Sequence, residues 1–165
     1  MPAENILGKV DGGFSIANER LTRNRIPYAA ACLGVAMRAQ DMAIEYVKIR
    51  ETFGDLLATR QTVQNMLIDN EMDIRTARWL TLAAAHKADQ GEPFRTEAAM
   101  AKIAATEAGG RVVDRAMQIH GGYGVTKEFP FERWFREMRI RRIGEGPNEV
   151  QRLIIARDLI GGSFH

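Results

Sequence analysis

Cysteine is scarce in this chain, and no hydrophobic run is long. Cys32 is the only cysteine among 165 residues, which excludes an internal disulfide and any metal site built from several cysteines. The longest uncharged apolar stretch, Tyr28 to Met37, is about half of the roughly 20 residues that a membrane-spanning helix needs. The start at Met1 lacks the basic and apolar regions of a secretory signal. We therefore expect a cytoplasmic protein with no membrane partner.

Net charge is also small. The 23 basic and 21 acidic side chains leave +2 at pH 7, which supplies no long-range field toward nucleic acid. One basic run, residues 133–142, mixes arginine with Trp134 and Phe135, as some nucleic-acid-binding surfaces do. An amphipathic helix that buries Trp134, Phe135 and Met138 accounts for the same pattern, and nearby glutamates partly neutralise it. We expect no nucleic-acid partner.

Metal-binding and dinucleotide patterns are missing as well. The residues three places before the three histidines are Ala83, Met117 and Gly162, so the Glu-x-x-His pairs of a di-iron bundle are absent. The glycines at 121, 122 and 124 have the wrong spacing for a dinucleotide fingerprint and follow a helical pattern instead of a strand. We expect no metal, and any nucleotide cofactor has to bind in another way.

The chain is instead rich in long helical patterns. Only five prolines interrupt it, and no alternating strand pattern competes. Apolar residues recur at spacings of four and three from Ile26 onward, which predicts a bundle helix. Its predicted buried seam consists of Ile26, Ala30, Leu33, Met37, Gln40, Ile44 and Val47. Pro27 can end, start or kink this helix, so its extension upstream to Asn18 is left open.

Further helices are predicted at about 61–87, 96–120 and 147–160, with a short segment at 131–139. Thr59 is the expected N-cap of the first of these, Gly91 follows its end, and Pro147 and Gly161 bracket the last. Glycines 109 and 110 weaken the continuity of the segment at 96–120. The predicted fold is all-α: a four-helix up-down bundle with an additional short C-terminal helix over residues 15–165. Residues 1–14 are predicted to be an extended lead from an upstream domain that the chain lacks.

Four local patterns stand in a fixed order along the chain. They are Arg50-Glu51-Thr52-Phe53-Gly54 followed by Gln61; Glu97-Ala98-Ala99-Met100-Ala101-Lys102; Gln118-Ile119-His120-Gly121-Gly122-Tyr123-Gly124; and Glu145-Gly146-Pro147-Asn148-Glu149-Val150-Gln151-Arg152. The lead from Pro2 to Gly8 adds a further match. Together these patterns resemble the C-terminal helical domain of the acyl-CoA dehydrogenases, and the resemblance covers essentially the whole chain.

The resemblance implies an FAD-dependent enzyme that desaturates an acyl-CoA between Cα and Cβ. In that family a carboxylate takes the α proton, a hydride leaves Cβ for the flavin, and electron-transferring flavoprotein reoxidises the flavin. Family members carry two further domains upstream and assemble as homo-oligomers, usually tetramers. We therefore expect a dimer or tetramer and little activity from this chain alone.

The resemblance also implies roles for individual residues. Glu145 matches the catalytic base, although the same letters read as a helix start with Gly146 as N-cap. Arg25 matches an arginine near the CoA side of the substrate channel. Asn24 stands where a subset of the family places its base. The residues that match FAD contacts are Arg50, Thr52, Phe53, Gln61, Gln118, Ile119, Gly121, Gly122, Gly146 and Asn148.

Local chemistry offers simpler roles for several of these residues. Arg50 at a helix end favours the negative end of the helix dipole, and Gly121 and Gly122 suit a helix C-cap. His120 is expected to pack or to form a hydrogen bond. Gly144 replaces a frequent aromatic residue and is expected to enlarge the space beside Glu145, and Pro147 removes a hydroxyl and a backbone donor.

Two other functions stay open at this point. An acyl-CoA oxidase on the same scaffold would pass electrons to oxygen, so turnover without an acceptor protein would identify it. A non-catalytic helical module for assembly or binding is suggested by the missing upstream domains. The presence of Glu145, Arg50 and Gln61 argues against that module.

Overall fold

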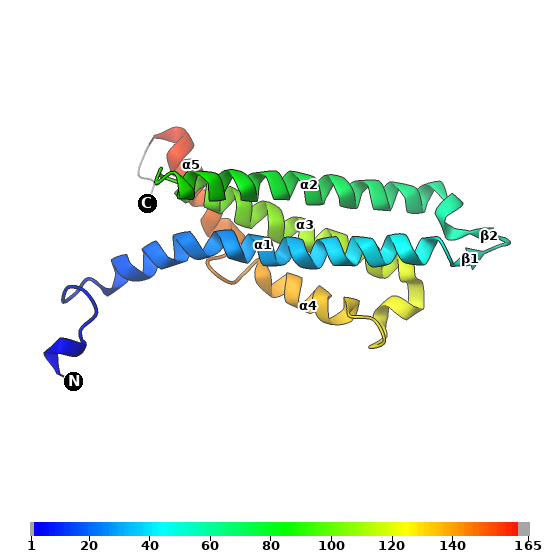
Figure 1. Ribbon diagram of the computed structural model, residues 1–165, viewed down its shortest axis with the longest axis horizontal. Helices are drawn as coiled ribbons and strands as arrows, with labels where there is room; N and C mark the ends of the chain where they lie inside the picture. Colours follow the sequence, from blue (N-terminus) through cyan, green and yellow to red (C-terminus); the bar gives the residue numbers. More distant parts are fainter. Residues whose placement is uncertain (1, 162–165) are drawn as a thin grey trace.

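Five helices dominate the computed structural model, which describes residues 2–161 (Figure 1). They are α1 (Gly13–Val47), α2 (Gln61–Asp89), α3 (Arg95–His120), α4 (Phe131–Arg141) and α5 (Asn148–Ile160). The shorter elements are the 3-10 turns η1 (Ala3–Asn5), η2 (Leu57–Thr59) and η3 (Gly121–Val125), and an antiparallel hairpin of β1 (Glu51–Thr52) and β2 (Asp55–Leu56). The prediction of an all-α fold is confirmed, with this small hairpin as an addition.

The first four helices run alternately up and down, and α5 crosses one end of the bundle (Figure 1). α3 contacts each of the other four helices and forms the centre of the packing. The hairpin lies at one end of the bundle, and the turn between α4 and α5 lies at the other. This topology places the C-terminal end of α1 beside the hairpin, and an earlier part of the same helix beside the turn between α4 and α5.

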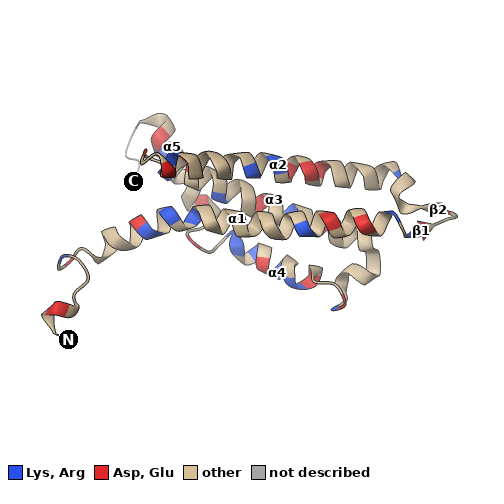
Figure 2. Ribbon diagram, viewed as in Figure 1, with Lys and Arg blue, Asp and Glu red and all other residues tan. Residues whose placement is uncertain are grey.

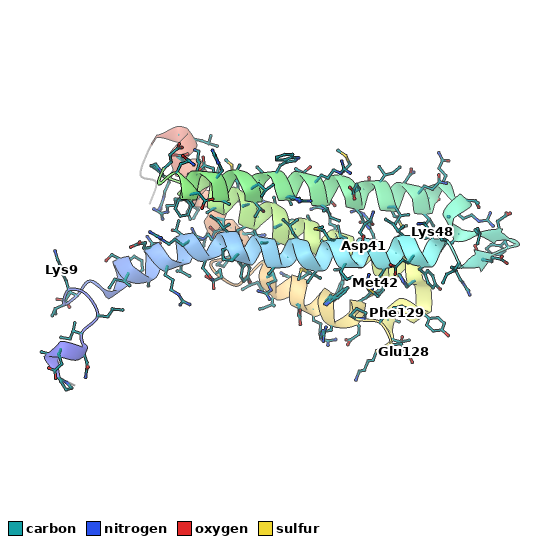
Figure 3. All side chains as sticks on the ribbon, in the orientation of Figure 1. Lys9, Asp41, Met42, Lys48, Glu128 and Phe129 are labelled. Carbon is teal, nitrogen blue, oxygen red and sulfur yellow. The ribbon has the colours of Figure 1, made fainter. Side chains whose placement is uncertain are left out.

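The start of the chain departs from the extended lead that was predicted. η1 already forms a 3-10 turn, and α1 begins at Gly13 and continues through Pro27. The N-terminal part of α1 extends beyond the bundle, and Lys9, just before this helix, lies well away from the packed helices (Figure 1 and Figure 3). Proline is tolerated here because its missing N–H removes a single helical hydrogen bond while the rest of the long helix stays intact.

α1 buries part of the face that its periodicity predicts, because Leu33, Gln40 and Val47 are buried. Ala30 and Met37 of the predicted seam are exposed, and smaller residues beside them are fully buried. These buried small residues are Ala29, Cys32, Ala36, Ala39 and Ala43. The partner helix α3 also presents small residues: Ala98, Ala101, Ala105 and Ala108. Two small faces allow close backbone approach, so alanine instead of the largest apolar side chains defines this interface.

Glycines 109 and 110 do not interrupt α3, and each lies close to a flexible side chain of the segment that packs on this helix. A Cβ added to Gly109 would lie 2.9 Å from the sulfur of Met138 on α4. A Cβ added to Gly110 would lie 2.4 Å from a guanidinium nitrogen of Arg142. These positions let α4 and the turn that follows it pack closely against α3.

Helix ends follow some of the predicted caps and not others. Gly91 and Gly161 adopt positive φ after α2 and α5, as expected for helix C-terminal glycines. The N-cap prediction for Thr59 is wrong: Arg60 is the N-cap residue, and the Thr59 hydroxyl donates to the Leu56 carbonyl. Pro147 is the N-cap of α5 and does not lie inside its first turn.

Charged residues of both signs alternate along the helices (Figure 2). On α4, Met138 is buried and Trp134 is partly buried, but Phe135 is exposed, so only part of the predicted apolar face is covered. Over residues 2–161, no helix is long and apolar enough to cross a membrane. The same residues contain no cluster of three or more His, Cys, Asp or Glu side chains placed to hold a metal ion.

Candidate active site and cofactor-binding residues

The predicted site residues fall into two groups at opposite ends of the bundle. Arg25, Glu145, Gly146 and Asn148 gather around the turn between α4 and α5, and the others lie near the hairpin and η3. Along α1, the step from Arg25 to Val47 measures about 33 Å at 1.5 Å per residue. The two groups are therefore separate sites on one chain.

Glu145 occupies a strained backbone position in the turn before α5. Its φ is 57°, in the left-handed region that non-glycine residues rarely adopt, and Gly146 follows at 88°. Such a conformation costs on the order of 1 kcal/mol or more and persists where the surroundings impose it. The Oε2 atom of Glu145 is buried and has no hydrogen-bond partner within residues 2–161. The backbone that carries Glu145 is thus fixed in an unusual conformation, and one carboxylate oxygen is available to accept a proton.

Arg25 supplies the positive charge at this end. Its side chain is buried on α1, and its Nε and Nη1 atoms have no hydrogen-bond partner in the described part of the chain. Burial lowers the pKa of Arg25, nearby Arg95 lowers it further, and Glu145 acts in the opposite direction. Buried donors and a buried acceptor without partners mark a place where a polar ligand completes the hydrogen bonding.

Lys102 and Gln151, which carried no predicted role, support the turn around Glu145 together with Asn148, which was predicted to contact FAD. The Lys102 ammonium donates to the carbonyl of Gly146 at 3.0 Å, and Gln151 Nε2 donates to the same carbonyl at 3.1 Å. Asn148 donates its side-chain N–H groups to Thr106 and Glu107, and its backbone N–H to Arg142. Asn148 therefore serves the turn and leaves no free donor for a cofactor.

The position of Lys102 in the sequence already indicates that it is buried. It lies four residues after Ala98 and three before Ala105, in the middle of the buried alanine face of α3. A lysine at the spacing of a buried face needs hydrogen-bonding partners there. That placement points to a structural or functional anchor.

The space beside Glu145 is not enlarged by Gly144, contrary to expectation. A Cβ added to Gly144 would lie 2.6 Å from the hydroxyl oxygen of Tyr28. The Arg141 guanidinium lies over the Tyr28 ring, 4.7 Å from its centroid. Burial raises the pKa of Tyr28, so its hydroxyl stays protonated at neutral pH. Tyr28 on α1 thus fills the volume that the glycine leaves.

The second group surrounds a cavity of about 540 Å³ at the hairpin end. Of the predicted cofactor residues, Arg50, Thr52, Ile119, Gly121 and Gly122 line it. Gly121 has a φ of 61°, and a Cβ on Gly121 or Gly122 would meet no atom within 4 Å. The Arg50 guanidinium and the Thr52 hydroxyl are donors that suit a phosphate group, and the two glycines leave room for it, although the Gly121 N–H already donates to the Gln118 carbonyl. The residues present therefore fit part of an FAD molecule.

The remaining predicted FAD residues lie outside this cavity. Phe53 is almost fully exposed at the hairpin tip, with a φ of 53°, and Gln61 and Gln118 are exposed on α2 and α3. The hairpin is held by Arg60, whose Nη2 donates to the Thr52 carbonyl at 2.6 Å and pairs with Asp55. The three exposed residues can meet a ligand only on the outer surface of the chain.

His120 has the packing role that was predicted for it. Its ring is buried and stacks on Tyr46 at 4.2 Å between centroids, and its Nδ1 lies 2.8 Å from the Ala116 carbonyl. Burial lowers the pKa of His120, so the ring is neutral at pH 7. It forms a rigid wall of the cavity and not a charged contact.

The fold and these two sites define the class of the chain. The family described as "Acyl-CoA dehydrogenase, C-terminal domain" matches residues 11–160, and the chain belongs to that family. The expected resemblance is confirmed.

Several relatives are similar over nearly the full chain. The short-chain specific acyl-CoA dehydrogenase of Bos taurus mitochondria is 43% identical over 160 residues, which are 97% of this chain and 39% of that protein. The structure of butyryl-CoA dehydrogenase from Megasphaera elsdenii matches with a TM-score of 0.94 and 42% identity, over 97% of this chain and 42% of its own.

A structure reported for the electron transferring flavoprotein of Acidaminococcus fermentans matches with a TM-score of 0.95 and 41% identity, over 98% of this chain and 43% of its own. The chain thus spans about two fifths of the length of the relatives it matches.

Proposed function

We propose that this chain is the part of an FAD-dependent acyl-CoA dehydrogenase that carries the catalytic base, Glu145. The observation that carries the proposal is the buried Oε2 of Glu145 in a strained turn beside the buried Nε and Nη1 of Arg25, none of which has a hydrogen-bond partner within residues 2–161. A fixed carboxylate with a free oxygen is suited to abstract a proton. The substrate is an acyl-CoA, as the names of the relatives suggest.

The reaction removes two hydrogens from the acyl chain. The proton on Cα moves to Oε2 of Glu145, and the C–H electron pair becomes the new bond between Cα and Cβ. FAD, when bound, accepts the hydride that leaves Cβ. The cation of Arg25 lies on the same side as Glu145 and is placed to attract the anionic CoA portion of the substrate.

FAD contacts are proposed at both ends of the bundle. Gly146 follows the base directly, and Arg50, Thr52, Ile119, Gly121 and Gly122 line the distant cavity. Because the two ends are about 33 Å apart along α1, one extended FAD does not reach both. We assign the cavity, together with the exposed Phe53, Gln61 and Gln118, to the FAD of a second copy.

If the cavity holds the FAD of a second copy, the chain must assemble as a homo-oligomer, and we propose a dimer or tetramer. The outer face of α2 supports it, because exposed apolar side chains recur there at helical spacing: Ile68, Met72, Trp79 and Leu82. Exposed apolar stripes of this kind mark interaction surfaces.

Electron-transferring flavoprotein is the proposed electron acceptor. The single, buried, unpaired Cys32 is consistent with a reducing compartment such as the cytoplasm.

The test is Glu145→Gln in the complete enzyme, with this chain as its C-terminal domain. The amide keeps the shape but loses the basic oxygen, so FAD and acyl-CoA binding persist while the rate of flavin reduction falls by roughly 10²-fold or more. Glu149→Gln, on the exposed side of the first turn of α5, is the matched control with an unchanged rate. Flavin reduction by the Glu145 variant at the wild-type rate would refute the proposal.

The 165-residue chain alone is expected to lack dehydrogenase activity, because it spans only about two fifths of its relatives. Mixing the purified chain with FAD and a short-chain acyl-CoA under anaerobic conditions tests this. Bleaching of the flavin absorbance by the chain alone would contradict it.

A further inference from the structure

We propose that Lys102 is the positioning residue for the catalytic base, acting by fixing the Arg142–Asn148 turn that presents Glu145. The inference rests on the proposed role of Glu145. Its basis is the set of hydrogen bonds by which one buried ammonium joins the backbone on both sides of that residue.

Lys102 is fully buried on α3, and its ammonium group has three acceptors. Nζ lies 3.1 Å from the Arg142 carbonyl, 3.0 Å from the Gly146 carbonyl and 2.7 Å from Asn148 Oδ1. A lysine ammonium has three N–H donors, so every donor is used. Charge-assisted bonds of this kind are stronger than neutral ones.

The three acceptors lie on both sides of Glu145 in the chain. Arg142 comes three residues before it, and Gly146 and Asn148 follow within three residues. The peptide therefore wraps around one cation, and the convergence on Nζ holds Glu145 at its positive φ of 57°. Nothing in the local sequence favours that conformation, since glutamate is not a residue that adopts it readily.

A second layer of contacts fixes Asn148, the strongest acceptor of the three by distance. Its Nδ2 donates to Glu107 Oε1 at 2.8 Å and to Thr106 Oγ1 at 3.1 Å, and the Thr106 hydroxyl donates to the Lys102 carbonyl at 2.8 Å. The network starts and ends on α3. The central helix of the bundle thus sets the position of a turn that is more than 40 residues away in sequence.

The charge state of Lys102 is compatible with this role. Burial lowers its pKa to about 8; Cys32, Glu149 and Glu107 act to raise the pKa, and Arg25 to lower it. Because this pKa lies above 7, the ammonium form with its three donors predominates at neutral pH.

The experiment compares Lys102→Met with wild type in the complete enzyme, measured as flavin reduction per bound FAD. Methionine fills similar volume without donors, so the turn relaxes while the carboxylate remains. Misplacement of a reacting group by about 1 Å costs about 10²-fold in rate. We expect the limiting rate to fall at least tenfold, and the acyl-CoA concentration at half saturation to change less than threefold.

Val113→Ala is the control for general loss of stability. Val113 is fully buried further along the same helix and takes no part in the hydrogen bonds of Lys102. It should lower the thermal midpoint but leave the rate per bound FAD within twofold of wild type. A Lys102→Met enzyme with wild-type rate per flavin would overturn the inference, even if it were less stable.

Two further experiments distinguish failure of the positioning role of Lys102 from failure of the proposed function of Glu145. If Lys102→Met does not retain FAD, Lys102→Gln decides, because its uncharged amide has only two donors for the three acceptors: a rate within twofold of wild type overturns the inference, and a reduced rate supports it. If Glu145→Gln reduces flavin normally, the proposed function itself fails. If Glu145→Gln is slow while both Lys102 variants react normally, only the positioning role fails.

Discussion

The hydroxyl oxygen of Tyr28 lies only 2.6 Å from the point where a side chain on Gly144 would begin. This relationship ties α1 to the turn that carries Glu145. A methyl group at position 144 requires Tyr28 or the turn to move, and overpacking of this kind typically costs about 1–3 kcal/mol.

We therefore expect Gly144→Ala to lower the free energy of unfolding by about 1–3 kcal/mol. In a Tyr28→Phe background the clashing oxygen is gone, so the same substitution costs less, with a coupling of about 1 kcal/mol. Denaturant titration of the four proteins measures this double-mutant cycle. Equal costs in the two backgrounds would show that the tyrosine hydroxyl does not limit the space.

Arg50→Ala should weaken FAD retention more than folding. A cation near a helix C-terminus contributes about 0.3–1 kcal/mol, whereas a charge-assisted hydrogen bond to a phosphate contributes about 1.5–3 kcal/mol. The expected loss of FAD affinity in the complete enzyme is thus about 10- to 100-fold. Flavin content after dialysis and the thermal midpoint of the apoprotein measure the two effects separately.

The control for Arg50 is Arg38→Ala on α1, the helix that precedes Arg50. Arg38 is exposed, lies outside the cavity, and forms only a 3.8 Å pair with Glu45. Its removal should change neither flavin content nor the midpoint appreciably. If Arg50→Ala kept its FAD but lowered the midpoint of the apoprotein, Arg50 would be a helix cap and nothing more.

Asp73 on α2 should make stability depend on pH. Burial acts to raise its pKa, but hydrogen bonds from Arg111 at 2.6 and 3.0 Å and from Arg115 at 2.8 Å outweigh burial and lower it. A carboxyl whose pKa is lower in the folded state stabilises the fold above its unfolded pKa of about 3.9 and loses that contribution as pH falls through its folded pKa.

Asp73→Asn is thus expected to cost about 1–2 kcal/mol at pH 7, and the difference from wild type should shrink as the pH drops below about 4. Urea unfolding at pH 7 and at several acidic values measures it. Glu71→Gln is the control, because the Glu71–Arg75 pair on the same helix is more exposed and contributes less. A cost for Asp73→Asn that stayed constant with pH would exclude an ionic contribution.

Trp79→Glu should disrupt self-association. Trp79 is 72% exposed in the middle of the apolar stripe on the outer face of α2, and a carboxylate cannot be buried there without a partner. Sedimentation of the complete enzyme should show a shift to smaller species. Ile140→Glu is the control, because Ile140 is also exposed and belongs to α4, which lies on the other side of the bundle from α2 (Figure 1). A variant with the same mass as wild type would remove the α2 face from the interface.

The sequence largely determined where the helices begin and end. Apolar periodicity, proline and glycine are local signals, because each influences only the residues within a few positions of it. α2 and α3 begin within a residue of their predicted starts, and Gly91 and Gly161 end helices as expected. Family membership could also be read from the order of the short motifs. Thr59 failed as a cap because the hairpin and η2 before α2 redirect its hydroxyl to Leu56.

Only the tertiary structure decided which faces are buried and how the site residues group. Periodicity in α1 is compatible with two neighbouring faces, and the alanines of α3 select the one with small residues. The separation of Arg50 from Glu145, the filling of the space at Gly144 by Tyr28, and the anchoring of the turn by Lys102 all join segments far apart in the chain. Such contacts require residues from distant parts of the chain to lie within a few ångströms of each other. Buried polar groups also need hydrogen-bond partners, and a short sequence pattern does not show which residues these will be.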